Sequence, residues 1–388
     1  MRAAPHAIFC DDIAGRARAF SRPERIITAH RAEEVSPALE EMEEARRSGK
    51  WLAGYMAYEA GFMLEPVLAH LAPAKPEVPY LSFGIFGTPE EWPLAHNHAP
   101  RKIEDIGFTD FRPLWNFKAY AQRFDTLHTN LMAGNCYQGN LTFPVHARFT
   151  GAPWSGFQAL STRQPVRYAA FIDLDGPCIL SRSPELFFRV DDNGFIETHP
   201  MKGTAPRGKS RIEDEAIVAA MLDDEKTLAE NCMIVDLLRN DISRIAETGS
   251  VHVPKLFEIE TYPTLHQMVS HVRARLLPDL SIADIFTALF PCGSITGAPK
   301  IAAMKILHEL EDGPRGAYCG AIGHIAPTGA MLFNVAIRTV SLFADGQAVF
   351  NVGGGIVLDS TAEAEYREAL LKARFVTGDH ALHSTYSG

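Results

Sequence analysis

Residues 331–352 read MLFNVAIRTVSLFADGQAVFNV, and this stretch decides the class of fold. Over residues 331–338 the side chains alternate between two sets, which is the period of a β-strand with two different faces. Asp345-Gly346 is a typical tight turn, and residues 348–352 form the returning strand. The stretch therefore predicts an antiparallel hairpin.

A similar pattern lies upstream, in residues 166–202. Strands are predicted at 168–173 and at 179–190, with an interruption at Ser183-Pro184-Glu185, and a further strand follows the turn Asn193-Gly194. We interpret this region as an antiparallel meander. Because the strands gather in hairpins and do not alternate singly with helices, the predicted class is α+β with large, mostly antiparallel sheets.

Helical patterns separate these strand regions. The segment 31–50 is charged and typical of a solvated helix, and residues 117–133 predict a helix with Gly134 as its C-cap. The last helix begins with the capping-box pattern Ser360-x-x-Glu363 and runs to about Val376. Two further helical regions are predicted at 211–247 and 299–311.

Residues 72–116 are rich in proline and histidine, which predicts an edge strand with long connections. We therefore divide the chain into an N-terminal portion, residues 1–112, packed on a core of residues 113–378, with a tail at 379–388.

Composition excludes several classes of protein. The chain has 388 residues, 46% of them hydrophobic and 22% charged, and a formal net charge of -10, which argues against nucleic-acid binding. No apolar run approaches the roughly 20 residues that span a bilayer, and the first residues lack an apolar signal core. The 6 cysteines are scattered without a Cys-x-x-Cys pair. That pattern favours reduced thiols and a cytoplasmic location, with no membrane partner.

The segment from Pro200 to Gly208, PMKGTAPRG, places a lysine between two prolines. The prolines exclude a helix interior or a central strand, so we predict a turn. Gly203 allows the backbone to approach a ligand closely, and Thr204 adds two donors. An ordinary surface turn with a solvated lysine is the alternative.

Other polar residues stand out in the second half of the chain. Glu365 and Glu368 are neighbours on one helix face, where they suit a hard dication or, alternatively, form a solvated acidic stripe with Lys372 as an i,i+4 partner. Glu230 lies in a helical segment that is apolar at 233–238, where it either faces a site or has a structural role at the helix N-terminus. Arg338 stands alone on an apolar strand face, where it needs an anion, either a structural carboxylate or a ligand. A Gly/Ser/Thr loop at 291–300 and the glycines at 353–355 add free N–H groups that suit an anionic ligand. Together these groups suit a small, multiply anionic substrate.

These segments occur in the order seen in a known family. They are Ser183-Pro184-Glu185, the Lys202 segment, Glu230 to Asp241, Gly293 to Lys300, Gly320 to Gly323, Arg338, and Gly353 to Glu368. The chain resembles the chorismate-utilising enzymes, which include anthranilate, aminodeoxychorismate, isochorismate and salicylate synthases. The resemblance covers residues 117–376, and N-terminally it rests on residues 54–61. It implies that the antiparallel sheets pack as a sandwich with helices on the outside.

Three positions sort the chemistry within that family. Gln138 stands where water-adding members have a lysine, and glutamine cannot act as a base at neutral pH. Lys202 stands where anthranilate synthase-like members have alanine, and Gln267 where they have a histidine. The chain therefore looks like the aminodeoxychorismate synthases, component I. An anthranilate synthase large subunit is one alternative, and a non-catalytic chorismate-binding subunit is the other.

The resemblance also implies roles for single residues. Lys202 would attack ring carbon 2 of chorismate and expel the 4-hydroxyl, and Glu185 would be the general acid/base. Glu230 and Glu368 would bind Mg²⁺, with Glu365 helping through water. Substrate-binding roles are implied for Gly203, Thr204, Gln267, Ser294, Tyr318, Arg338 and Gly354. Ammonia would come from a separate glutaminase subunit in a heterodimer, and no fused glutaminase or lyase is expected in the chain.

Overall fold

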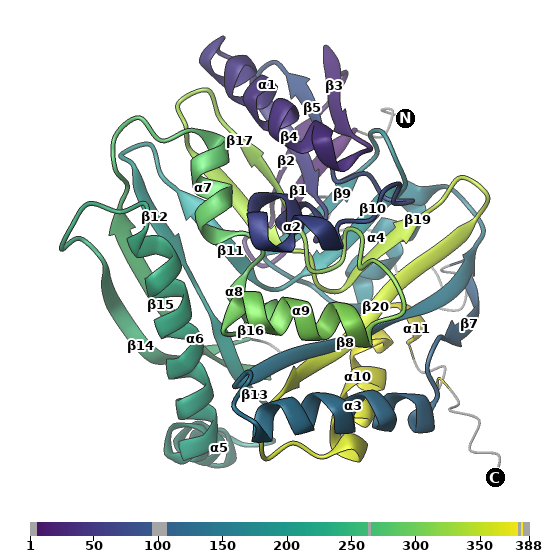
Figure 1. Ribbon diagram of the computed structural model, residues 1–388, viewed down its shortest axis with the longest axis vertical. Helices are drawn as coiled ribbons and strands as arrows, with labels where there is room; N and C mark the ends of the chain where they lie inside the picture. Colours follow the sequence, from purple (N-terminus) through teal and green to yellow (C-terminus); the bar gives the residue numbers. More distant parts are fainter. Residues whose placement is uncertain (1–5, 95–106, 263–264, 379–381, 383–388) are drawn as a thin grey trace.

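The computed structural model describes residues 6–94, 107–262, 265–378 and 382. Over these residues the chain forms two ten-stranded antiparallel sheets with helices around them (Figure 1). A cluster of buried side chains from both sheets, among them Phe9, Ile179, Tyr55 and Ile322, joins their inner faces. The predicted α+β sandwich is thus confirmed.

The first sheet contains the first and the last strands of the chain. Its order is β16 (Gly297–Ala298), β8 (Gln138–Phe149), β20 (Gln347–Ile356), β19 (Thr339–Leu342), β10 (Cys178–Ser183), β9 (Tyr168–Ile172), β1 (Ala7–Asp11), β2 (Arg16–Phe20) and β6 (Glu90–Trp92), with β7 (Phe108–Pro113) also paired to β8.

The second sheet contains most of the strands between them. Its order is β13 (Met201–Pro206), β15 (Leu265–Arg275), β12 (Phe195–Thr198), β11 (Leu186–Val190), β18 (Met331–Val335), β17 (Ala321–Ile325), β4 (Trp51–Met56), β5 (Leu81–Phe86) and β3 (Arg25–Ala29), with β14 (His252–Thr261) also paired to β15.

Helices cover the outer faces of both sheets. On the first sheet lie α3 (Phe117–Met132), α4 (Pro153–Arg163), α10 (Ala362–Lys372) and α11 (Arg374–Thr377). On the second lie η1 (Ala32–Glu34), α1 (Val35–Arg47), α2 (Ala60–Leu64), η2 (Pro66–Leu71), α6 (Glu225–Ser243) and α7 (Ile282–Leu289). The remaining helices are α5 (Arg211–Asp223), α8 (Gly293–Thr296) and α9 (Lys300–Leu310).

Both predicted hairpin regions cross from one sheet to the other. The chain leaves β10 for β11 at residues 183–185, and it leaves β18 for β19 at residues 336–338. We call these two crossings the seam. They are bonded to each other, since the Arg182 N–H donates to the Arg338 carbonyl at 2.9 Å and the Val335 N–H donates to the Glu185 carbonyl at 3.1 Å. The predicted turns at Asn193-Gly194 and Asp345-Gly346 are confirmed, because they join β11 to β12 and β19 to β20 as antiparallel pairs. The single meander and the continuous strand over 331–338 are wrong, because an alternating pattern does not report which sheet a strand joins.

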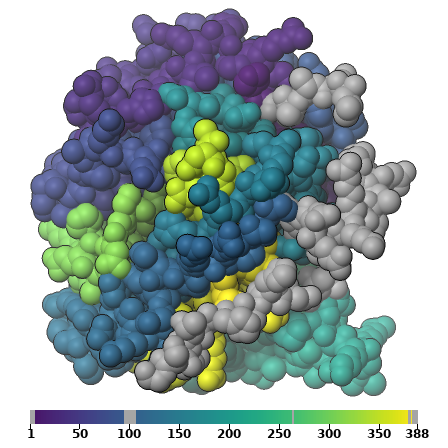
Figure 2. All heavy atoms as spheres, turned by 90° about the vertical axis from the view of Figure 1, so that its right-hand side faces the viewer, coloured from purple at the N-terminus to yellow at the C-terminus, as the bar shows by residue number. Residues whose placement is uncertain are grey.

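The first 112 residues are interwoven with the rest of the molecule. β1 and β2 belong to the first sheet, whereas β3, β4 and β5 belong to the second. β6, at the edge of the first sheet, confirms the edge strand predicted in residues 72–116, whereas β5 in the same region is buried along its length between β4 and β3. Residues 95–106 of that region and most of the tail lie outside the described residues. Figure 2 shows the same mixing on the surface, where yellow C-terminal atoms lie among blue and teal atoms of the first half.

The structure also bears on the predictions made for single helices. α3 ends next to Gly134, which has the positive φ of 74° expected of a C-cap. The 31–50 helix is only half solvated, because α1 buries Val35, Leu39 and Met42. The capping box at Ser360 is wrong: Thr361 is the N-cap, and the Ser360 hydroxyl donates to Glu365 instead. No helix among the described residues is long and apolar enough to cross a membrane.

Candidate active site

A cavity of about 160 Å³ lies beside the seam. It brings together five residues that the sequence analysis singled out: Glu185, Lys202, Ser294, Tyr318 and Arg338. They come from the two crossings, from β13, from α8 and from the segment before β17. The rest of the lining is Asn140, Met201, Ile295, Ile337, Asn351, Val352, Gly353, Gly355, Lys372 and Phe375.

Glu185 is buried at the first crossing, with 7% of its surface exposed. Its Oε1 accepts a hydrogen bond of 2.7 Å from the Ser294 hydroxyl. Burial raises the pKa of Glu185, while the Ser294 hydrogen bond and the charge of Lys202 oppose that rise. A carboxyl group in this environment can hold a proton and release it, as a general acid/base must.

Lys202 lies on β13, which pairs with β15 on one side only, so the predicted turn is in fact an edge strand. Its Nζ makes no hydrogen bond or ion pair with any described residue. A Cβ added to Gly355 would lie 3.5 Å from Lys202 Nζ and 3.1 Å from Gln138 Nε2. Gly355 therefore leaves room for these two side chains to meet at the cavity.

Gln138 is completely buried, and neither its amide nitrogen nor its amide oxygen has a partner among the described residues. Buried polar atoms of this kind are rare, because each costs desolvation free energy without a compensating bond. An unsatisfied amide next to a cavity suits a polar ligand atom.

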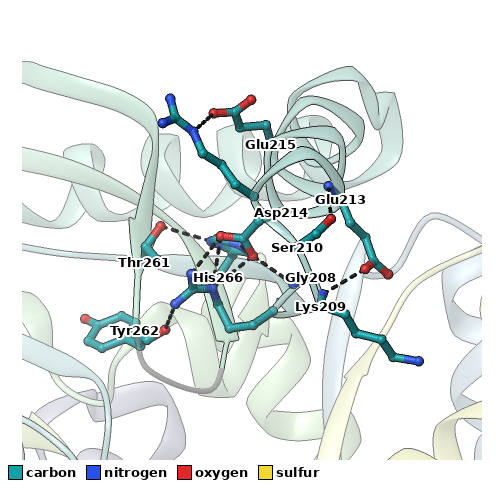
Figure 3. Close-up of polar contacts among 11 residues, drawn as sticks. Gly208, Lys209, Ser210, Glu213, Asp214, Glu215, Thr261, Tyr262 and His266 are labelled. Carbon is teal, nitrogen blue, oxygen red and sulfur yellow. Dashed lines mark hydrogen bonds and ion pairs between the residues drawn. The ribbon is translucent and has the colours of Figure 1, made fainter.

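A polar network holds the far end of β13 (Figure 3). The Asp214 carboxylate accepts hydrogen bonds from Arg207 at 2.7 Å and from the Gly208 N–H at 2.7 Å, and it lies 2.8 Å from His266 Nε2. Arg207 also donates to the Tyr262 carbonyl at 2.9 Å. These contacts lower the pKa of Asp214 well below its usual range, Arg207 most of all. The network fixes the strand that carries Lys202 to α5 and to the β14–β15 hairpin.

Arg338 has a positive φ of 51° at the second crossing, which directs its side chain to the cavity. No described carboxylate forms an ion pair with it. Burial lowers its pKa to about 10, because a charge is costly where water is excluded. Together with Tyr318, which also lines the cavity, it suits an anionic group of a ligand.

Four predicted substrate-binding residues, Gly203, Thr204, Gln267 and Gly354, stand outside the cavity lining. The Thr204 hydroxyl donates to Gln267 Oε1 at 2.7 Å, and Gln267 Nε2 donates to the Gly203 carbonyl at 2.7 Å. These bonds tie β13 to β15. Gly354 lies between two lining glycines, and a Cβ added to it would be 3.2 Å from Glu365 Oε2.

The three predicted metal ligands are not assembled into a metal centre. Within the described part of the chain, no group of three or more acidic, histidine or cysteine side chains is placed to hold a metal ion. Glu365 accepts from Ser360, and its pKa is raised by burial and then by the charges of Glu368 and Glu230. The charges of Glu368 and Glu230 thus both reach Glu365.

Lys372 is the positively charged residue beside Glu368. Its Nζ lies 2.9 Å from Glu368 Oε1 and donates to the Gly353 carbonyl at 2.9 Å. The sequence analysis treated it only as a helix partner of Glu368. It also lines the cavity, which i,i+4 spacing alone could not indicate.

The loop at 291–300 is also different from the prediction. A Cβ added to Gly297 would lie 2.2 Å from the Gln138 carbonyl oxygen, and one added to Gly293 would lie 2.4 Å from Leu237 Cδ2. These glycines permit close packing, so their presence is no sign of an anion site. The loop supplies Ser294 to the cavity instead.

Comparison with known proteins defines the class to which this fold and site belong. Residues 4–378 match the family model described as chorismate binding enzyme, and the chain belongs to that family. It is 37% identical over 355 residues to "Aminodeoxychorismate synthase component 1" of Klebsiella aerogenes, covering 85% of this chain and 77% of that protein.

Two further relatives are also similar to this chain. "Aminodeoxychorismate synthase" of Streptomyces griseus is 44% identical over 254 residues, and the match covers 66% of this chain but only 35% of that longer protein. "Anthranilate synthase component 1" of Methanothermobacter thermautotrophicus is 35% identical over 354 residues, 84% of this chain and 75% of that protein.

A solved structure supports the fold directly. The crystal structure of anthranilate synthase component I from Streptococcus pneumoniae TIGR4 is similar with a TM-score of 0.79 and 27% identity, covering 97% of this chain and 93% of that one. The chain is therefore an enzyme of the chorismate-binding family.

Proposed function

We propose that this enzyme is an aminodeoxychorismate synthase, component I, which converts chorismate and ammonia to 4-amino-4-deoxychorismate for p-aminobenzoate and folate synthesis. The observation that carries the proposal is the unpaired Lys202 amino group at a cavity that Glu185 also lines, with the unsatisfied amide of Gln138 beside the same lining residue, Gly355. The names of relatives at 37% and 44% identity support it.

The proposed reaction has two displacements. The Lys202 amine adds to ring carbon 2, the two ring double bonds shift, and the bond from carbon 4 to its hydroxyl breaks. Glu185 gives its proton to the departing hydroxyl, which leaves as water, and the resulting Glu185 carboxylate would take the proton that the attached amine loses. Ammonia then adds at carbon 4, the double bonds shift back, and Lys202 leaves carbon 2 and regains its proton. The net change replaces hydroxyl by amine.

The anion-binding part of the proposal rests on charge. Arg338 and Tyr318 would hold the enolpyruvyl carboxylate, and Gly354 would donate its N–H to the same group. The Thr204 hydroxyl would reach the ring carboxylate only if its bond to Gln267 rearranged, whereas Gly203 bonds to Gln267 through its carbonyl and would use its N–H.

Magnesium is part of the proposal as the counter-ion of the ring carboxylate. Glu230 and Glu368 would hold it, with Glu365 through water: carboxylate oxygens are the ligands that such an ion takes, and the charges of Glu368 and Glu230 both act on Glu365, although the three are not arranged as a metal centre in this structure. When bound, it would neutralise negative charge on the substrate. Lys372 would then have to release Glu368, with which it is paired in this structure.

A partner component is implied by the name of the Klebsiella aerogenes relative. We propose that this partner is a glutaminase that supplies ammonia. A cytoplasmic location remains a prediction, which the 6 free cysteines support.

The test is mass-spectrometric analysis of products from chorismate, Mg²⁺ and excess ammonium. We expect a product that has exchanged hydroxyl for amine and kept its enolpyruvyl group. Omitting Mg²⁺ and adding EDTA should stop the reaction. Lys202→Ala should lower kcat by about 100-fold or more, because the nucleophile is lost. Lys209→Ala, which removes another lysine seven residues away, should leave the rate unchanged.

The rival is anthranilate synthase, the activity named for the similar Streptococcus pneumoniae structure. Both atoms of the Gln267 side-chain amide are engaged with Gly203 and Thr204, and a glutamine cannot supply a base for aromatisation. Anthranilate with pyruvate as the products would nevertheless overturn our proposal in favour of this rival.

A further inference from the structure

A chain of three buried hydrogen-bonding side chains ends at Glu185. The Ser294 hydroxyl donates to Glu185 Oε1 at 2.7 Å, and Cys292 Sγ lies 3.3 Å from the Ser294 oxygen. The exposed fractions of Cys292, Ser294 and Glu185 are 3%, 8% and 7%. The chain is therefore shielded from bulk water along its length.

Counting protons fixes the direction of these hydrogen bonds. An ionised Glu185 can only accept, so Ser294 must give its single hydroxyl proton to the carboxylate. The S–H of Cys292 is then the donor between the thiol and the Ser294 oxygen. The thiol keeps its proton, because burial and the nearby charge of Glu185 raise its pKa to about 12.

Bonds in such a series strengthen one another. A hydroxyl that accepts a hydrogen bond becomes a better donor, and donation to a carboxylate favours its ionised form. Glu185 and the thiol are the two partners of the Ser294 hydroxyl among the described residues, so without the thiol its orientation depends on Glu185 alone.

We propose that Cys292 is a positioning residue that holds the Ser294 hydroxyl on Glu185 and thereby stabilises the carboxylate form of the general acid/base. The inference rests on the proposed function for the role of Glu185 in the reaction. Other charged or titratable groups also face the cavity: Lys202 from β13, whose charge acts on Glu185, Tyr318 from before β17, Arg338 from the seam and Lys372 from α10.

The competing explanation is that Cys292 only packs. It belongs to the buried cluster beneath the second sheet, where a thiol serves as a small apolar group. Removing a methylene-sized group from such a cluster changes stability but leaves the Glu185 carboxylate unaffected. A readout of Glu185 itself separates the two explanations.

The experiment is a substrate-free titration of Glu185 by ¹³C NMR of protein labelled at the glutamate side-chain carboxyl carbon, with Glu185→Gln to assign the signal. Cys292→Ala should raise the titration midpoint by about half a pH unit or more, the effect of losing one hydrogen bond. Cys292→Ser, which keeps a donor, should stay within about 0.2 units of the parent protein. If Cys292→Ala does not fold, Cys292→Val fills the space without a donor and should give the same upward shift.

Cys178→Ala is the matched control, because Cys178 is another buried thiol, in β10, without a contact to Ser294. It should leave the midpoint unchanged. An unchanged midpoint in Cys292→Ala or Cys292→Val, or an equal rise in Cys292→Ser, would overturn the proposal and leave packing as the role. The titration uses no substrate, so it succeeds or fails independently of which product the enzyme makes.

Discussion

Arg338 carries a positive charge into the seam, where no described carboxylate balances it. Arg315 is the contrasting case, since its buried guanidinium donates to both oxygens of Glu311 at 2.8 Å. A buried charge with a partner stabilises the fold only modestly, whereas one without a partner is costly and is usually explained by a ligand.

From this contrast we expect opposite effects of two matched substitutions. Arg338→Met should leave the free energy of unfolding unchanged or raise it by about 1 kcal/mol, and should raise KM for chorismate by about 10-fold or more. Arg315→Met should lower the free energy of unfolding by about 3 kcal/mol, since it leaves Glu311 buried without its partner. Urea denaturation and steady-state kinetics measure both quantities. A loss of stability in Arg338→Met equal to that in Arg315→Met would show that Arg338 is a structural residue.

At the scale of elements, α5 is unusual because none of its side chains is buried. Most helices in proteins are held by an apolar face, so α5 must rely on polar contacts at its N-terminus. The Asp214 network supplies them, and it joins α5 to β13 and to the β14–β15 hairpin (Figure 3).

Asp214→Asn tests whether this network orders the strand of Lys202. The amide keeps the shape of the side chain but loses its charge, so we expect faster hydrogen exchange in residues 200–210 and a kcat several-fold lower. Protection in the parent protein, taken relative to the intrinsic exchange rate at each pH, should also fall on acidification, because a carboxylate with a depressed pKa loses its stabilising contacts only as pH falls below the usual range of aspartate. Asp236→Asn, which removes an exposed partner of Arg239, is the control and should change neither. Equal exchange in all three proteins would rule out the proposed ordering.

At the scale of the whole molecule, the sequence predicted the strands better than their partners. The period of two along residues 331–338 marked β18 correctly, but it continued through the crossing at 336–338, where the backbone turns to the other sheet. Nothing in an alternating pattern reports a positive φ at an arginine. Lys202, Glu185, Ser294, Tyr318 and Arg338 were found through motifs that keep their order in the family, and the fold brings them to one cavity. Gln138 was identified only by its position in the family. Its amide is unsatisfied because of how the chain packs around Gly355, which a sequence pattern does not report.

Glu59 links the N-terminal portion to the core and gives the whole molecule a predicted pH dependence. Its side chain accepts hydrogen bonds from the Arg315 N–H at 2.5 Å and the Gly316 N–H at 3.0 Å, and burial raises its pKa from 4.5 to about 7. Because the folded state holds this proton more tightly than the unfolded state, the contribution of Glu59 is most favourable below pH 4.5 and is lost as pH rises to about 7.

Glu59→Gln should remove this part of the pH dependence. Between pH 5 and pH 8, we expect the unfolding free energy of the parent protein to fall by about 2 kcal/mol relative to that of the variant, at 1.36 kcal/mol per pKa unit. Urea denaturation of both proteins at four pH values measures the difference, and the exposed Glu363→Gln serves as a control that should show none. A constant difference across this range would mean that Glu59 is ionised in the folded protein, so that the two N–H donors outweigh its burial.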